Sequence, residues 1–152
     1  MALDFSKYLN VDVDSIEAPA APPLGHYHAQ FVSWKGAERD YDKANGGPKT
    51  PVVEVTFKIT APDTDAEEED AAAAAKAVGR LVSKDYTLSD EAGMYGLRRL
   101  TAETCGVDTK GLALEDALNA CKGADVKVFN QPRPGKEEGV FYTNIKSVLP
   151  AN

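Results

Sequence analysis

Two strand-like stretches near the end of the chain, ADVKVFN at residues 124–130 and GVFYTNIKSV at residues 139–148, flank the loop QPRPGKEE at residues 131–138. Valine and aromatic residues favour strands, and the prolines and the glycine of the loop mark a turn. The sequence therefore predicts a β-hairpin that supplies the last two strands of the fold.

This hairpin interleaves cationic and aromatic side chains: Lys127, Phe129, Arg133, Lys136, Phe141, Tyr142 and Lys146. Cations that contact phosphates and flat rings on which bases stack are the groups that hold single-stranded nucleic acid. An ordinary half-buried hairpin, with its rings in the core and its lysines in water, has the same pattern. The hairpin alone leaves both interpretations open.

The size and composition of the chain indicate one soluble domain. Its 152 residues correspond to about one domain, and 43% hydrophobic residues suffice for a core. There is no run of about 20 apolar residues, and the start MALDFSKYLNVDVD lacks the basic and apolar parts of a secretory signal. Cys105 and Cys121 have no CxxC spacing and are expected to be reduced, packed thiols. We therefore expect a cytoplasmic protein without a membrane span.

The formal net charge of −7 is unevenly distributed. Residues 61–79 carry −5 and residues 1–24 carry −3, which leaves +1 for the rest of the chain. The main body is thus near neutral, and its overall charge neither requires nor excludes a polyanionic ligand.

The first 24 residues are expected to form an extended arm, and residues 25–150 a folded domain. Residues 17–24, EAPAAPPL, contain three prolines, which exclude a helix or a central strand. Phe5, Tyr8 and Leu9 of the arm could dock on the domain or on a neighbouring subunit.

Three more strands are predicted before the hairpin: GHYHAQFVSWK at residues 25–35, PVVEVTFKITA at residues 51–61 and RLVSKDYTL at residues 80–88. In the first strand, alternation places Tyr27, Ala29, Phe31 and Ser33 on one face, and His26, His28, Gln30, Val32 and Trp34 on the other. In the second, Val53, Val55, Phe57 and Ile59 face inward, and Glu54, Thr56 and Lys58 face outward.

Helices are predicted between these strands and before the hairpin. The acidic, alanine-rich segment at residues 63–79 begins with a Thr64/Glu67 capping box and ends at Gly79. A helix capped by Ser89 runs to Gly106, and a short second helix places Leu114, Ala117, Leu118 and Cys121 on one stripe. Three strands, a helical segment and two strands correspond to a five-stranded OB-fold barrel, with the acidic helix as an insertion after the second strand.

Two stretches resemble bacteriophage OB-fold single-stranded-DNA-binding proteins: PLGHYHAQFVSW at residues 23–34, and KGADVKVFN with VFYTNIKSVLPA at residues 122–130 and 140–151. The likeness involves Gly25 and Tyr27 at the start of the domain and Tyr142, Asn144, Ile145 and Lys146 in the last strand. It implies sequence-independent binding of single-stranded DNA during phage replication or recombination, in the host cytoplasm. It also allows partner proteins of those processes and a homodimer.

In an OB-fold the ligand lies across strands two and three, between the loops that join strands one and two and strands four and five. This placement gives the following candidate nucleic-acid-binding residues: Trp34, Lys35, Tyr41, Lys43, Lys58, Lys84, Tyr86, Lys127, Phe129, Arg133, Lys136, Tyr142 and Lys146. Trp34, Tyr41 and Phe129 are expected to stack on bases, and Phe141 and Ile145 to hold the barrel together. Alternatives are a small hydrophobic cluster of Trp34 with Val32, and a core position for Tyr86.

Other function classes find less support in the sequence. His26 and His28 with the two cysteines lack the paired spacing of a zinc site, and no nucleophile, paired carboxylates or phosphate-binding glycine loop stands out. We expect no enzyme, no metal and no cofactor. The competing interpretation is a protein-interaction adaptor built on the same barrel.

Overall fold

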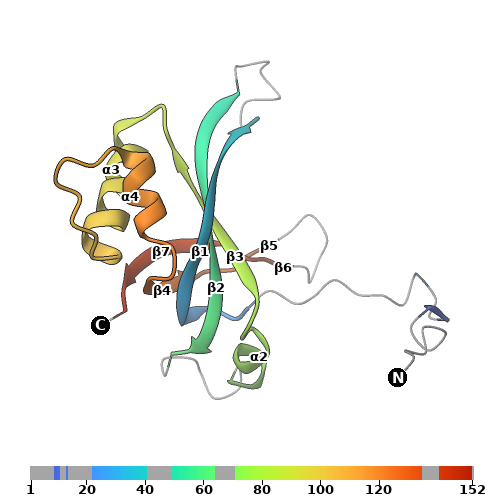
Figure 1. Ribbon diagram of the computed structural model, residues 1–152. Coiled ribbons are helices and arrows are strands. Elements are labelled where there is room, and N and C mark those ends of the chain that lie inside the picture. Colours follow the sequence, from blue (N-terminus) through green and yellow to red (C-terminus); the bar gives the residue numbers. More distant parts are fainter. Residues whose placement is uncertain are drawn as a thin grey trace.

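Figure 1 shows the computed structural model of the protein, which describes residues 9–10, 13, 22–40, 49–63, 71–134 and 141–151. The described strands are β1 (Gly25–Arg39), β2 (Thr50–Pro62), β3 (Leu81–Thr87), β4 (Asp125–Asn130), β5 (Arg133–Pro134), β6 (Phe141–Tyr142) and β7 (Ile145–Pro150). The described helices are α2 (Ala71–Lys76), α3 (Glu91–Arg99), the π-helical turn η4 (Leu100–Thr104) and α4 (Leu114–Ala120). None of these helices has the length and apolar character needed to cross a membrane.

Five strands form one antiparallel sheet in the order β3-β2-β1-β4-β7, while β5 and β6 pair with each other. The predicted order of three strands, a helical segment and two closing strands is confirmed. The predicted hairpin is also present, because β4 pairs with β7, and the short β5–β6 ribbon lies between them in the chain. The sheet is not closed, since β3 and β7 are its two edges. The fold is mainly β, and α3 and α4 lie together on one side of the strands (Figure 1).

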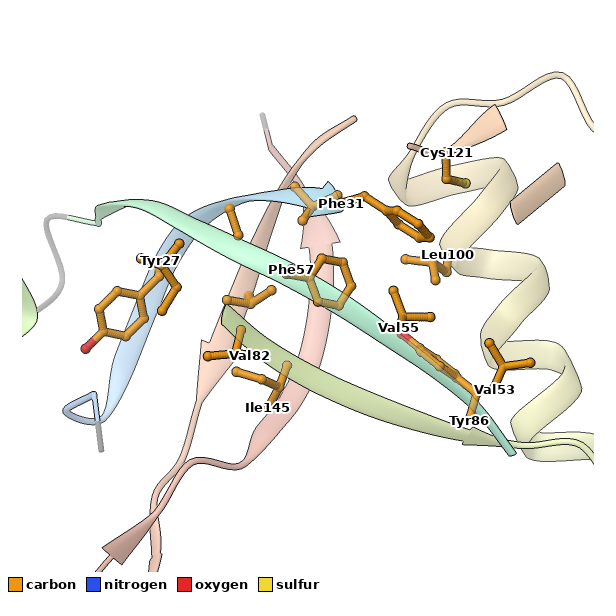
Figure 2. Packing of buried hydrophobic residues seen from close by; sticks show 14 of the residues in the cluster. Tyr27, Phe31, Val53, Val55, Phe57, Val82, Tyr86, Leu100, Cys121 and Ile145 are labelled. Carbon is orange, nitrogen blue, oxygen red and sulfur yellow. The ribbon is translucent and has the colours of Figure 1, made fainter. Parts of the chain in front are cut away.

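The core forms between one face of the sheet and the helices. The predicted alternation of β2 is confirmed, because the four side chains expected to face inward are at most 4% exposed: Val53, Val55, Phe57 and Ile59. Figure 2 shows Phe31, Phe57 and Leu100 in this cluster. Phe31 and Phe57 meet edge to face, with ring centroids 5.7 Å apart, in the geometry that aromatic pairs favour.

A β-bulge at Val32 corrects the predicted faces of β1. Phe31 pairs with Phe57 and Ser33 pairs with Thr56, so Val32 is an extra residue without a partner in β2. An extra residue inverts the alternation beyond it. Ser33 therefore lies on the outer face, and Trp34 packs against the main core instead of forming a cluster with Val32.

The helix after β3 begins one residue later than predicted and presses closely on the strand. Asp90, and not Ser89, is the N-cap of α3, and its carboxylate accepts a hydrogen bond of 2.6 Å from the Gly93 amide. A Cβ atom on Gly93 would lie 1.9 Å from the carbonyl oxygen of Thr87. Glycine at this position lets α3 cover the end of β3.

The remaining predicted helices agree with the structure where it describes them. In α4 the predicted stripe is confirmed, since Ala117 and Leu118 are buried and Leu114 packs against the core. Cys121 is a buried free thiol and Cys105 a partly buried one, as expected. The helix α2 covers only part of the expected segment, and the Thr64/Glu67 capping box lies outside the described residues.

The end of the N-terminal arm contacts the domain of its own chain. The Tyr27 hydroxyl donates a hydrogen bond of 2.7 Å to the carbonyl of Pro23. The fully buried Asn130 donates through Nδ2 to the carbonyl of Pro22 at 2.6 Å and accepts through Oδ1 from the Asn144 amide at 3.0 Å. These three hydrogen bonds fix the point at which the chain enters β1, next to the start of β7.

Candidate nucleic-acid interface

The outer face of the sheet, turned away from the core, carries three of the predicted lysines on adjoining strands. Residues directly paired across an antiparallel ladder lie on the same face. Lys58 of β2 pairs with Gln30 of β1, and Lys127 of β4 pairs with His28 of β1. Lys35 also faces outward, because the bulge at Val32 shifts the alternation of β1. The strand order thus spreads the three ammonium groups across neighbouring strands.

An aromatic pair lies on the same outer face. Phe129 pairs with His26 across β1 and β4, and their ring centroids are 4.8 Å apart at an interplanar angle of 47°. In β4, Val126 and Val128 are fully buried, while Phe129 shares the half-exposed face with Lys127. Phe129 is therefore placed where a base could stack on it.

Acidic side chains on this face are paired with particular cations. Asp63 lies 2.9 Å from Lys127 Nζ and 3.9 Å from His28 Nε2. Arg39 donates to Asp85 at 2.9 Å and also to Glu54.

Within the part of the chain that the structure describes, Lys35 and Lys58 form no ion pair and are exposed. They are the cations of the outer face that a phosphate could contact without displacing a carboxylate.

A cleft of about 430 Å³ opens between β3 and the segment that joins β6 to β7. One wall comes from β1, β2 and β3, and the other from the start of β7; the lining residues are Arg39, Glu54, Ser83, Lys84, Asp85, Thr143, Asn144 and Ile145. Asp85 pairs with Glu54, and Glu54 pairs with Lys35, so these three side chains share the outer face. The cleft therefore adjoins the surface that carries Lys35.

Lys84 spans the opening between the two edge strands. Its ammonium group donates to the carbonyls of Ile145 at 3.5 Å and Lys146 at 3.4 Å, and lies 5.4 Å from the centroid of the Tyr86 ring. Burial lowers the pKa of Lys84. Lys84 lines the cleft, and its donors are directed at the backbone of β7.

Tyr86 lies in the core and not in the groove, which confirms the alternative interpretation of this residue. Its side chain pairs with the inward-facing Val53, and the residue is 7% exposed. Burial raises the pKa of the Tyr86 hydroxyl well above its usual range. A base could not stack on this ring.

Trp34 is also not an open stacking surface. The bulge turns it toward the core, and its indole Nε1 donates a hydrogen bond of 3.0 Å to Asn119 Oδ1 in α4. The expectation that Trp34 lies on the face opposite Phe31 is wrong, because the alternation was extended through a residue that has no partner in β2.

The β5–β6 ribbon and the beginning of β7 contain three more of the candidate nucleic-acid-binding residues. Arg133 and Tyr142 are paired and exposed, with Tyr142 at 59%. Lys146 is exposed at a bulge in the β4–β7 pairing, opposite the step from Phe129 to Asn130. Tyr41, Lys43 and Lys136 lie outside the described residues.

Several residues of the cleft were not among the predicted site residues: Glu54, Ser83, Asp85, Thr143 and Asn144. The alternation of β2 already showed that Glu54 faces outward, but no local signal indicated that it would meet Asp85. Among the described residues no group of three or more His, Cys, Asp or Glu side chains could hold a metal ion.

Comparison with known proteins adds no relative, because neither a family model nor a curated protein sequence matches the chain.

Proposed function

We propose that the protein binds single-stranded DNA with little sequence preference and coats it during replication or recombination of a phage genome. The observation that carries this proposal is the outer face of the sheet. Lys35 and Lys58 are exposed there without ion pairs among the described residues, and Phe129 lies on the same face beside His26. Phosphate contacts from lysines and stacking on an accessible ring are the two terms on which such binding depends.

The proposal includes an OB-type, partly open barrel. The strand order β3-β2-β1-β4-β7, with helices between β3 and β4, supports this topology, because β3 and β7 are then the strands that approach each other. The bonds from Lys84 to two carbonyls of β7 support it further. In such a barrel the ligand would cross β2 and β3 and be bordered by the β5–β6 ribbon, which carries Arg133 and Tyr142.

The structure also changes which residues we propose for the contacts. Phe129 and Tyr142 remain candidates for stacking, whereas Trp34 and Tyr86 are engaged in the core. Lys35, Lys58 and Arg133 remain candidates for phosphate contacts, and Lys127 would have to exchange Asp63 for a phosphate. Homodimer formation and contacts with replication or recombination proteins remain proposals that follow from the resemblance.

Charge reversal on the outer face tests the function directly. We expect the double variant Lys35→Glu, Lys58→Glu to bind fluorescently labelled oligo-dT at least about tenfold more weakly than the native protein, because two phosphate contacts are replaced by repulsion. The binding is measured by fluorescence anisotropy, with duplex DNA of the same length as a comparison.

Lys110→Glu is the matched control, because Lys110 is exposed in the loop before α4, on the helical side of the molecule (Figure 1). It should bind like the native protein. If the native protein bound no single-stranded DNA, or if the double variant bound as tightly as the native protein, the proposed function would be wrong. If the native protein did not bind single-stranded DNA, the competing function, a protein-interaction adaptor, would be favoured.

A further inference from the structure

We propose that Lys127 and His28 form a phosphate site that is occupied by the carboxylate of Asp63, so that Asp63 withholds Lys127 from the bound strand. This inference rests on the proposed function and goes beyond it, because it gives one residue of the outer face a role opposed to binding. The observation that carries it is the ion pair of 2.9 Å between Asp63 Oδ2 and Lys127 Nζ.

This ion pair joins the end of β2 to β4 across β1. Asp63 directly follows β2, and its backbone amide donates a hydrogen bond of 2.9 Å to the carbonyl of His26 in β1. Lys127 pairs with His28 across β1 and β4, so both side chains lie on the outer face. His28 Nε2 is 3.9 Å from Asp63 Oδ1. The carboxylate therefore lies beside nitrogen atoms from two neighbouring strands.

A carboxylate and a phosphate make the same kind of contact with an ammonium group. Both are anionic acceptors, and lysine binds either of them as a compact point charge. The side chains of Lys127 and Asp63 are 25% and 21% exposed, so a phosphate could reach this position from solvent. Asp63 is held there by its own backbone, which gives its carboxylate a high effective concentration beside Lys127. The carboxylate is therefore a built-in competitor of the phosphate.

Lys127 is also well placed for a nucleotide, because it lies beside the ring proposed for stacking. Residues two apart on a strand share a face and are separated by about 7 Å, as Lys127 and Phe129 are. The phosphate of a nucleotide stacked on Phe129 would therefore lie within reach of Lys127. If Asp63 released it, Lys127 would add one phosphate contact to those proposed for Lys35, Lys58 and Arg133.

The salt dependence of oligo-dT binding tests this competition. Asp63→Asn keeps the size of the side chain and removes its charge, so Lys127 becomes available to a phosphate. We expect the slope of log K against log salt concentration to be more negative than that of the native protein by about 0.7, the contribution of one contact. The affinity of the variant relative to the native protein should therefore grow about two- to threefold as salt falls from about 200 mM to about 50 mM. Fluorescence anisotropy measures both quantities.

Two further variants separate the release of Lys127 from a general change of charge. Asp125→Asn removes a carboxylate from the same face, because Asp125 is exposed and pairs with Gln30 across β1 and β4. Asp125 forms no ion pair within the described part of the chain, so this variant releases no lysine and should keep the native slope. The double variant Asp63→Asn, Lys127→Ala should return the slope to the native value.

Asp63→Ala removes the acceptor as well as the charge, and decides the matter if Asp63→Asn is unstable. A native slope in both Asp63 variants would overturn this inference and leave the proposed function intact. The inference would also be overturned if Asp125→Asn changed the slope as much as Asp63→Asn, or if the change persisted in the double variant. If the native protein bound no oligo-dT at any salt concentration, the proposed function would fail, and this inference with it.

Discussion

Lys84 and Tyr86 lie two residues apart on the same inward-facing side of β3, yet their surroundings differ. Tyr86 lies under α3, where a Cβ atom on Gly96 would come within 3.1 Å of its ring. Lys84 reaches past the end of the core to the carbonyls of β7. Alternation along a strand places both side chains on one face. Only the helix above the strand determines that Tyr86 is buried and that Lys84 lines a cleft.

The burial of Tyr86 has a consequence at alkaline pH. Because burial raises its pKa, the folded protein keeps the Tyr86 hydroxyl protonated where an unfolded tyrosine ionises, above about pH 10. The unfolded state then binds fewer protons than the folded state, so stability falls as the pH rises above about 10. We expect Tyr86→Phe to lose less stability than the native protein between about pH 8 and about pH 11, as measured by urea denaturation.

The exposed Tyr142 provides the comparison for this experiment. Tyr142→Phe should show the same loss of stability at alkaline pH as the native protein. If Tyr86→Phe lost as much stability as the native protein over this range, the hydroxyl of Tyr86 would not be the group responsible.

At the scale of the elements, the local patterns predicted which strands and helices form, but not how they meet. The inward face of β2 follows from its own alternation, so the sequence was sufficient there. The bulge at Val32 depends on the register with β2, which a single strand does not reveal, and it moved Trp34 to the core. The cleft could not be predicted for the same reason, since its walls come from four strands and the β6–β7 connection.

The contact between α3 and β3 depends on a single glycine. The Cβ atom of alanine at position 93 would overlap the backbone oxygen of Thr87, and backbone atoms cannot rotate away as a side chain can. We therefore expect Gly93→Ala to lower the free energy of unfolding by about 2 kcal/mol or more, as overpacked sites do. Urea denaturation of the purified variant measures this change.

Gly36→Ala is the control for this variant. Gly36 lies in β1, and a Cβ atom there would meet nothing within 4 Å. This variant should be as stable as the native protein or slightly more stable, because alanine restricts the unfolded chain. Equal stabilities for the two alanine variants would show that α3 moves away from β3 at no cost.

At the scale of the whole molecule, the formal charge of −7 and the proposed ligand have the same sign. The sequence showed where this charge is concentrated, since residues 1–24 carry −3 and residues 61–79 carry −5, and the rest of the chain carries +1. The fold adds that acids near the proposed interface are paired, as Asp63 is with Lys127 and Asp85 is with Arg39. In the proposed function, binding therefore depends on the few cations that remain on the outer face, and not on the net charge.

The salt dependence of the binding constant reports how many of these cations contact phosphates. Each phosphate contact with a single strand contributes a slope of about −0.7 to a plot of log K against log salt concentration, whatever the net charge of the protein. Contacts from Lys35, Lys58 and Arg133 should give a slope of about −2 for oligo-dT, and Lys58→Ala should reduce its magnitude by about 0.7. Anisotropy titrations over a series of salt concentrations measure both slopes, and Lys110→Ala should leave the slope unchanged. A slope near zero for the native protein, or the same slope for Lys58→Ala and Lys110→Ala, would show that the lysines of the outer face do not contact phosphates.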